Sequence, residues 1–233
     1  MFTVKLAGMC VEFDNRYGHL YEYCRDWLTR EAPLFRVKVY PDETETYMKN
    51  CGMPVSEAVA ERILAYRKAC AGLTEYGVFL LHGALISYRG QGVLFIAGRG
   101  VGKTTHIRLW KECFGNEVLF INGDKPLVKK LGDKYVGYGT PWRGKEGLGD
   151  NLCAPIDSVC FLDRAEKASV CKISAKDAAS LVSKQTVYPA RTEQYDIFSE
   201  NIADFLKSTR LFYARVNMNV NSAISVRDYL FGK

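Results

Sequence analysis

The stretch Gly92-Val-Leu-Phe-Ile-Ala-Gly-Arg-Gly-Val-Gly-Lys-Thr-Thr105 decides the fold of this chain. An apolar segment, 93–96, runs directly into a glycine-rich loop that ends in Gly102-Lys103-Thr104. Such a unit of strand, loop and helix is a P-loop, in which backbone N–H groups surround a phosphate and the lysine neutralises its β and γ oxygens. The threonine hydroxyl is suited to binding Mg²⁺. The sequence therefore predicts that the chain binds a nucleoside triphosphate.

The P-loop pattern in this stretch has one departure. The strict pattern has glycine five residues before Gly102, and this chain has Ala97 there. Either alanine is accepted at this corner or the loop is slightly reshaped. The context that the motif requires is otherwise present, because 93–96 is typical of a buried strand and 104–114 of a helix with one apolar side. Lys103 is expected to face solvent when no nucleotide is bound.

The composition is that of a folded α/β protein. With 233 residues, of which 48% are hydrophobic and 25% charged, the chain suits one α/β domain or a core with a small N-terminal part. No apolar run approaches the roughly 18–20 residues of a membrane span, and the N-terminus is too short and too mixed for a signal peptide. We therefore expect a cytoplasmic protein without a membrane partner.

Charge and cysteine spacing argue against two kinds of site. The formal net charge is +6, and no Lys/Arg block interleaves with aromatic residues, so nucleic-acid binding is not indicated. The eight cysteines form no Cys-x-x-Cys pair and have no histidine cluster nearby, which gives a zinc site little support. We expect free, buried thiols in a reducing cytoplasm.

The rest of the chain is predicted to combine strands and helices. Strands are expected near the N-terminus and over 35–40, 79–88, 93–96, 118–121 and 211–216. Helices are expected over 56–73, 104–114, 175–183 and 192–207 and near the C-terminus. Hairpins are predicted with turns at 89–92 and 164–167, the second one spanning 158–173. The glycine-rich segment 138–151 is interpreted as a mobile lid or substrate clamp, or as a simple connector.

Asp124 extends the candidate site beyond the P-loop. It lies 21 residues after Lys103 and follows the strand 118–121, at the carboxyl end where α/β sheets place ligand-binding residues. His82-Gly83 precedes the loop, on the strand expected to pair with it. This combination resembles the HPr kinase/phosphorylase and phosphoenolpyruvate carboxykinase superfamily. The resemblance covers about residues 78–165 and rests on His82-Gly83, Gly92-Val-Leu-Phe-Ile96, Gly98-Arg-Gly-Val-Gly-Lys-Thr104, Asp124 and Lys145-Glu-Gly-Leu-Gly149.

A narrower resemblance is to a bacterial branch of HPr-kinase-like proteins. Asn122-Gly-Asp-Lys-Pro126 and Gly139-Thr-Pro-Trp-Arg-Gly-Lys145 look like segments of that branch. Related small kinases occur with peptide-modifying systems and phosphorylate serine. The resemblance implies an α/β fold with a P-loop-containing mixed sheet and flanking helices. Residues 1–233 would form one HPr-kinase-like domain, with N-terminal strands and a helix in 1–75 and the nucleotide-binding core in 76–233.

The resemblance also implies a kinase with an alcohol-group acceptor that uses Mg²⁺ and ATP or GTP. The nucleotide would be bound by Gly98, Arg99, Gly100, Val101, Gly102, Lys103, Thr104 and Thr105. Lys103 would hold the β and γ phosphates, while Thr104 and Asp124 would hold Mg²⁺ and Thr105 would support that shell. HPr kinases assemble as hexamers, so the resemblance implies a homo-oligomer as well.

Three more side chains would belong to the catalytic set. His82 would lie near the transferred phosphoryl group, and Arg143 and Lys145 would lie on a loop that closes over it. HPr kinases carry two adjacent aspartates here, one of them the general base, and this chain has Gly123 in place of the first. His82 could be the base, since an imidazole titrates near neutrality. Asp124 could instead serve both as metal ligand and as base. In a third alternative the base matters little, because phosphoryl transfer relies mostly on positioning and electrostatics.

Three functions remain open at this stage. The first is a kinase that phosphorylates serine in a peptide or small protein, and the second is a kinase for a small-molecule hydroxyl. The third is a nucleotide-binding regulatory protein with little turnover, which the glycine at position 123 favours. A carboxykinase activity is not expected, because those enzymes are much longer and need further metal and substrate ligands.

Overall fold

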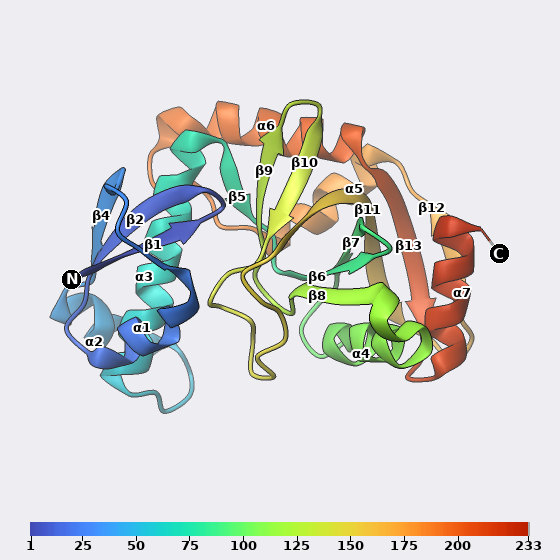
Figure 1. Cartoon of the computed structure of the whole chain (residues 1–233), viewed down its shortest axis with the longest axis horizontal. Coiled ribbons are helices and arrows are strands. Elements are labelled where there is room, and N and C mark those ends of the chain that lie inside the picture. The colour runs from blue at the N-terminus through green and yellow to red at the C-terminus, as the bar shows by residue number, and fades with distance from the viewer. Residues whose placement is uncertain (233) are drawn as a thin grey trace.

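The computed structural model describes residues 1–232, which form two mixed β-sheets with helices packed on their faces (Figure 1). The strands are β1 (Phe2–Leu6), β2 (Met9–Asp14), β3 (Leu28–Thr29), β4 (Phe35–Lys38), β5 (Val78–Leu80), β6 (Gly83–Tyr88), β7 (Gln91–Ile96), β8 (Val118–Asn122), β9 (Leu127–Leu131), β10 (Lys134–Tyr138), β11 (Cys153–Arg164), β12 (Ser169–Lys172) and β13 (Arg210–Val216). The helices are α1 (Gly18–Tyr23), α2 (Pro41–Asn50), α3 (Glu57–Leu73), α4 (Lys103–Phe114), α5 (Ala175–Val182), α6 (Tyr195–Ser208) and α7 (Val220–Phe231).

The smaller sheet and α3 form the N-terminal part of the molecule. The strand order is β3-β1-β2-β4, with β1 and β2 antiparallel and β2 and β4 parallel. Ser56 begins α3 where the sequence predicts, because its side chain accepts a hydrogen bond from the backbone N–H of Val59 and so caps the helix. The buried face of α3, which includes Ala65, Ala69 and Leu73, shares one apolar cluster with the strands of this sheet.

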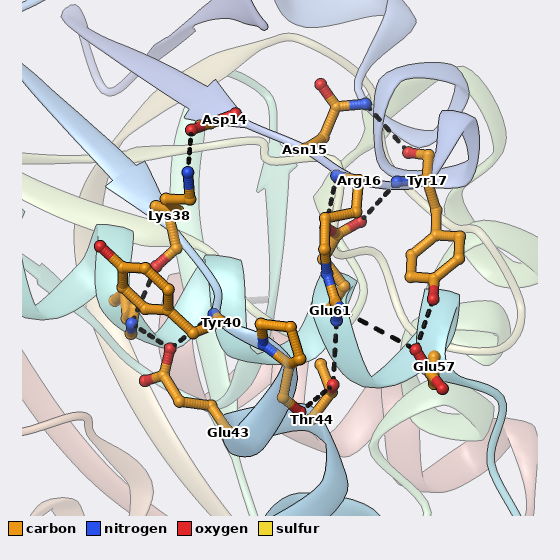
Figure 2. Close-up of polar contacts among 12 residues, drawn as sticks. Asp14, Asn15, Arg16, Tyr17, Lys38, Tyr40, Glu43, Thr44, Glu57 and Glu61 are labelled. Atoms are coloured by element: carbon orange, nitrogen blue, oxygen red, sulfur yellow. Dashed lines mark hydrogen bonds and ion pairs between the residues drawn. The ribbon is translucent and has the colours of Figure 1, made fainter.

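A polar network ties the chain after β2 to α3 (Figure 2). The Glu61 carboxylate on α3 is almost fully buried, and it accepts hydrogen bonds from the backbone N–H groups of Arg16 at 2.7 Å and Tyr17 at 3.2 Å. The Arg16 guanidinium lies 3.8 Å from Glu61 and donates to the Thr44 hydroxyl at 2.9 Å. Because a buried carboxylate is costly unless it is paired, these contacts fix the start of α1 against α3.

The larger sheet has the order β5-β9-β10-β11-β7-β6-β8, with β13 also paired to β11 and β12 paired to β13. The first residues of the long strand β11 pair with β10, and its later residues pair with β7 and β13. Strands β7, β11 and β13 are parallel to one another. Their carboxyl ends therefore reach the same edge of the sheet, and the loops that follow them lie close together there.

Side chains of these strands alternate between two apolar layers. In β7, Leu94 and Ile96 belong to the layer that contains α5 and α6, whereas Val93 and Phe95 belong to the layer that contains α4 and α7. This alternation is that of a strand buried on both faces. It explains why the segment before the P-loop is a continuous apolar run, and it holds the loop at the edge of a rigid sheet.

Most predicted elements are confirmed, including the four helices predicted over 56–73, 104–114, 175–183 and 192–207. The turn between β6 and β7 is also confirmed. It consists of Arg89 and Gly90, both with positive φ, as a two-residue hairpin turn requires.

The second predicted hairpin, over 158–173, is wrong. Strands β11 and β12 do not pair with each other, because β13 lies between them, parallel to β11 and antiparallel to β12. Helices α1 and α2, which lie in the segment 1–50 where strands and turns were expected, were also not predicted, and neither was the hairpin of β9 and β10.

All eight cysteines are free, and although Cys10, Cys24, Cys70 and Cys160 are buried as expected, Cys153 and Cys171 are exposed. Within residues 1–232, no helix is both long and apolar enough to cross a membrane. The division at residue 75 stays a prediction, and Trp142 from beyond it packs in the same apolar cluster as the N-terminal sheet.

Candidate functional site

The loop between β7 and α4 has the backbone conformation that its glycines allow. Gly100 and Gly102 have φ of +80° and +111°, a region that side chains with a Cβ rarely adopt. Ala97, which replaces the glycine of the strict pattern, is not among the residues with positive φ and is buried at the end of β7. Alanine is therefore accepted at this corner without backbone strain.

Lys103 is the first residue of α4, and its side chain turns back under the loop. The ammonium donates a hydrogen bond to the carbonyl of Ala97 at 2.9 Å, and only 9% of the residue is exposed. The expectation that Lys103 faces solvent is therefore wrong, because the loop's own carbonyl offers the ammonium an acceptor. Burial lowers the pKa of Lys103, against the opposing effect of the nearby Asp124 carboxylate. The positive charge lies directly beneath the loop.

Asn122, which the sequence analysis did not single out as a site residue, positions Asp124. The Asn122 side chain is fully buried, and its Oδ1 accepts the backbone N–H groups of Asp124 at 2.9 Å and Lys125 at 2.7 Å. Its Nδ2 donates to the Thr140 hydroxyl at 3.0 Å, which joins this turn to the glycine-rich loop. One feature of the sequence could have identified Asn122: it is a polar residue at the end of an apolar strand, directly before Gly123.

The Asp124 carboxylate has a hydrogen-bond partner at each of its two oxygens. Its Oδ1 lies 3.0 Å from Nε2 of His82, and its Oδ2 contacts the ammonium of Lys125. Burial on its own would raise the pKa of Asp124, but the His82 hydrogen bond and the Lys125 charge outweigh it and lower the pKa to about 2. Asp124 is therefore a carboxylate at neutral pH.

The glycine-rich loop is anchored by the N-terminal part of the molecule. The Trp142 ring stacks on Tyr66 of α3 with centroids 4.0 Å apart, and its Nε1 donates to the carbonyl of Arg62 at 3.2 Å. The Trp27 indole donates to the carbonyl of Gly139 at 3.1 Å. At the far end of the loop, the carbonyl of Leu148 accepts the N–H of Gly123 at 2.8 Å. These contacts argue against a lid that moves as a whole.

The two cations of this loop have different surroundings. The Arg143 guanidinium donates to the carbonyl of Gly149 at 2.8 Å and lies 5.2 Å from the Trp27 ring, so it also holds the loop together. Lys145 is exposed and, within residues 1–232, has no hydrogen-bond or ion-pair partner. Its neighbour Glu146 pairs with Arg108 of α4 at 2.6 Å.

Six of the expected site residues line one cleft of about 940 Å³: His82, Arg99, Thr104, Asp124, Arg143 and Lys145. Lys103 lies beneath it and Thr105 is exposed outside it, while Val101 and Gly102 line a different cavity. The cleft's other cations are Arg62, Arg67, Lys125 and Lys184, and its only acidic lining residues are Asp124 and Glu146. This excess of positive charge suits a polyanion.

The cleft residues fit a magnesium ion bound together with phosphates. The Thr104 hydroxyl and the ionised Asp124 carboxylate are oxygen ligands of the kind that Mg²⁺ prefers. Lys125 already places a positive charge at Oδ2 of Asp124. Within the described part of the chain, no three His, Cys, Asp or Glu side chains are placed to hold a metal. Further ligands would therefore be phosphate oxygens and water.

Comparisons with known proteins add a distant structural likeness. No family model matches the chain, and no curated protein matches it. The solved structure of an Hpr(Ser) kinase/phosphatase from Coxiella burnetii is similar to 65% of this chain and 95% of its own, with a TM-score of 0.38 and 9% sequence identity. A likeness this weak carries no argument about fold or activity, so function has to be argued from the residues of this chain.

Proposed function

We propose that this protein is an ATP- and Mg²⁺-dependent kinase that transfers the γ-phosphate to a hydroxyl, with serine of a peptide or small protein as the acceptor. The observation that carries the proposal is the meeting of Thr104, Asp124 and His82 in one cleft, beside a glycine loop with Lys103 beneath it. A phosphate-binding loop, a metal-binding carboxylate and an ionisable ring are the parts that phosphoryl transfer needs.

Each part has a role in this proposal. The loop N–H groups and Lys103 hold the β and γ phosphates, which fixes the phosphorus for attack. Thr104 and Asp124 hold Mg²⁺, which when bound offsets charge on the phosphate oxygens. The acceptor oxygen attacks the γ phosphorus as the bond to the β–γ bridging oxygen breaks, and ADP leaves. Lys145, exposed on the cleft wall, would stabilise charge on the transferring group.

The acceptor proton needs a base other than a second aspartate. A Cβ at Gly123 would lie 3.1 Å from Leu148 and 3.2 Å from the carbonyl of Arg143, so the packed loop opposes any larger residue there. His82 is the alternative that the geometry favours. Because ionised Asp124 can only accept, Nε2 of His82 carries the proton between them, and in the neutral ring Nδ1 is left free to take the acceptor's proton.

The test is a transfer assay with ATP labelled at the γ position, Mg²⁺ and a panel of serine-containing peptides. Mass gain and label on serine support the proposal. A panel of small-molecule alcohols tests the second kind of acceptor. If ATP binds tightly and label reaches no hydroxyl of either panel, the kinase proposal fails and a nucleotide-binding regulatory protein replaces it, as the glycine at position 123 would favour.

A further inference from the structure

A second cavity, of about 410 Å³, lies on the other side of the P-loop from the cleft. It is lined by Val101 and Gly102 of the loop, His106 of α4, and the segments 164–166 and 216–218 that follow β11 and β13. Since β7, β11 and β13 are parallel, these segments meet at the carboxyl edge of the sheet, where α/β proteins bind ligands. The proposed phosphoryl-transfer chemistry uses none of these lining side chains.

His106 lines this cavity and carries a buried donor that has no partner within the described residues. The residue is only 2% exposed, and its Nε2 lies 3.1 Å from the indole Nε1 of Trp110. An indole N–H can only donate, so Nε2 is the acceptor and carries no proton. Burial lowers the pKa of His106 to about 4, so the ring is neutral and its proton is on Nδ1. Within the described residues, Nδ1 is buried without a hydrogen-bond partner.

A buried donor without a partner costs folding free energy unless a ligand or water accepts from it. Nε2 of His106 is used by Trp110, so Nδ1 is the ring nitrogen left for an acceptor atom of a ligand or water. The helix position also matters. His106 lies one turn after Gly102, and its backbone N–H donates to the carbonyl of Gly102 at 2.9 Å, so the ring is held close to the phosphate loop.

The remaining walls combine apolar and charged side chains, since Arg164 and Glu166 also line the cavity. Val216 and Met218 come from the end of β13, and the Met218 methyl packs on Gly102, 2.5 Å from where a Cβ would lie. Asn217 between them is fully engaged: its Nδ2 donates to the carbonyl of Glu166 at 2.8 Å, and its Oδ1 accepts from the Ser222 hydroxyl at 2.7 Å. A cavity that combines apolar side chains with a few polar groups is the kind of surface that binds a small heterocyclic ligand.

The two cavities share the P-loop as a common wall. Arg99 and Thr104 face the cleft with Asp124, whereas Val101 and Gly102 face the second cavity. A triphosphate lying along the loop would present its γ end to the cleft and its nucleoside to the second cavity. We propose that this cavity binds the nucleoside part of the nucleotide and that Nδ1–H of His106 donates to an acceptor atom on it. The inference rests on the proposed nucleotide binding.

The experiment distinguishes the contribution of the nucleoside to binding affinity from that of the phosphates. Isothermal titration in Mg²⁺ buffer measures the affinities of ADP, GDP and inorganic tripolyphosphate for the wild-type protein and for His106→Leu. We expect His106→Leu to weaken binding of at least one of the two nucleotides about 10-fold, as the loss of one hydrogen bond does. Tripolyphosphate, which has no nucleoside, should bind unchanged. His19→Leu, at an exposed histidine, is the matched control.

His106→Leu also leaves the Trp110 indole without its acceptor, so it could change affinity by disturbing α4. A second variant controls for this effect. Ala165→Trp adds a large side chain at another lining residue of the cavity and leaves both partners of the His106–Trp110 hydrogen bond in place. It too should weaken nucleotide binding and spare tripolyphosphate. The inference is overturned if neither variant changes nucleotide affinity, or if both lower nucleotide and tripolyphosphate affinity equally. If the wild-type protein binds neither kind of ligand, the proposed function fails, and this inference fails with it.

Discussion

At the residue scale, Lys103 is a buried cation whose ammonium, among the described residues, donates to a carbonyl of its own loop. Lys103→Ala removes the charge that would meet the β and γ phosphates, so phosphoryl transfer should fall by on the order of 10²–10³. Lys103→Met keeps most of the buried alkyl chain without the charge and should lose as much activity. Initial rates with labelled ATP measure both. Lys134→Ala, at an exposed lysine of β10, is the control.

Since Lys103 is buried, stability has to be measured beside activity. Thermal unfolding of Lys103→Met should stay close to that of the wild-type protein, because removing a desolvated charge offsets the lost hydrogen bond to Ala97. Normal turnover in either variant would mean that the loop does not bind phosphate.

Asp124 is expected to be the acidic ligand of Mg²⁺. Asp124→Asn keeps the shape of the side chain but removes its negative charge, so the metal's charge is less compensated. Activity at a fixed Mg²⁺ concentration should fall by about 10²-fold or more, and more Mg²⁺ should be needed for half-maximal rate. An unaltered Mg²⁺ titration would contradict the assignment.

The same carboxylate gives a pH dependence of stability. In the folded protein the pKa of Asp124 is about 2, below its ordinary value of 3.8, so the ionised form stabilises the fold. This contribution is fully present above about pH 5 and is lost as the pH falls from about 4 to 2. Asp124→Asn has no such dependence. Between pH 7 and pH 3 the wild-type protein should lose about 1 kcal/mol of unfolding free energy relative to the variant.

Urea unfolding of both proteins at several pH values measures this difference. Other carboxyl groups titrate alike in the two proteins and cancel. A difference that stays constant between pH 7 and pH 3 would show that Asp124 is not held as a carboxylate by His82 and Lys125.

At the element scale, the loop after β10 has fixed ends and an exposed tip. Trp142 is stacked on Tyr66 of α3, and Gly139 lies too close to the carbonyl of Asp150 for any side chain, so the base of the loop is tightly packed. The tip at Lys145 and Glu146 is exposed, and the exposed ion pair of Glu146 with Arg108 connects it to α4. Any closure over a bound nucleotide should therefore be a movement of this tip and not of the whole segment.

Substitutions of the two loop cations, Lys145 and Arg143, should therefore have different effects. Lys145→Ala should reduce the rate of transfer by about 10-fold or more with little change in ATP affinity or stability, because its ammonium has no partner within the described residues. Arg143→Ala should reduce transfer and also destabilise the fold by about 1–2 kcal/mol, because it loses the bond to Gly149 and the contact with Trp27. Single-turnover rates, ATP titrations and urea unfolding measure the three quantities. Equal loss of stability in both variants would contradict the different roles of Arg143 and Lys145.

At the scale of the whole molecule, local signals in the sequence predicted most elements but not how they pair. The P-loop strand, the capped helix α3 and the Arg89-Gly90 turn each depend on neighbouring residues, and all three are confirmed. The hairpin over 158–173 failed because β13, about 40 residues further along, pairs with both of its strands. Nothing in the local pattern distinguishes a hairpin from two strands that accept a third between them.

In the candidate site, too, local signals were predicted and contacts between distant segments were not. The sequence predicted Lys103, Thr104 and Asp124 from a motif and a strand end. It did not predict Asn122 as the residue that positions Asp124, nor the burial of Lys103, because both depend on contacts with segments that fold against them. The anchoring of the glycine-rich loop by α3 is likewise a contact between distant parts of the chain.

That anchoring gives a prediction for the whole molecule: the N-terminal part and the larger sheet should unfold together. Tyr66 of α3 stacks on Trp142, and its hydroxyl donates to the carbonyl of Lys125 at 2.9 Å. Tyr66→Ala should therefore destabilise both parts by about 3–5 kcal/mol, whereas Tyr66→Phe, which keeps the stacking, should cost about 1 kcal/mol. Hydrogen exchange of β2 and β7 against denaturant measures the two parts separately, with Tyr195→Ala, at an exposed tyrosine, as the control. If β2 loses protection at a lower denaturant concentration than β7, or if Tyr66→Ala affects only β2, the two parts are independent, and α3 does not hold the loop that carries Arg143 and Lys145.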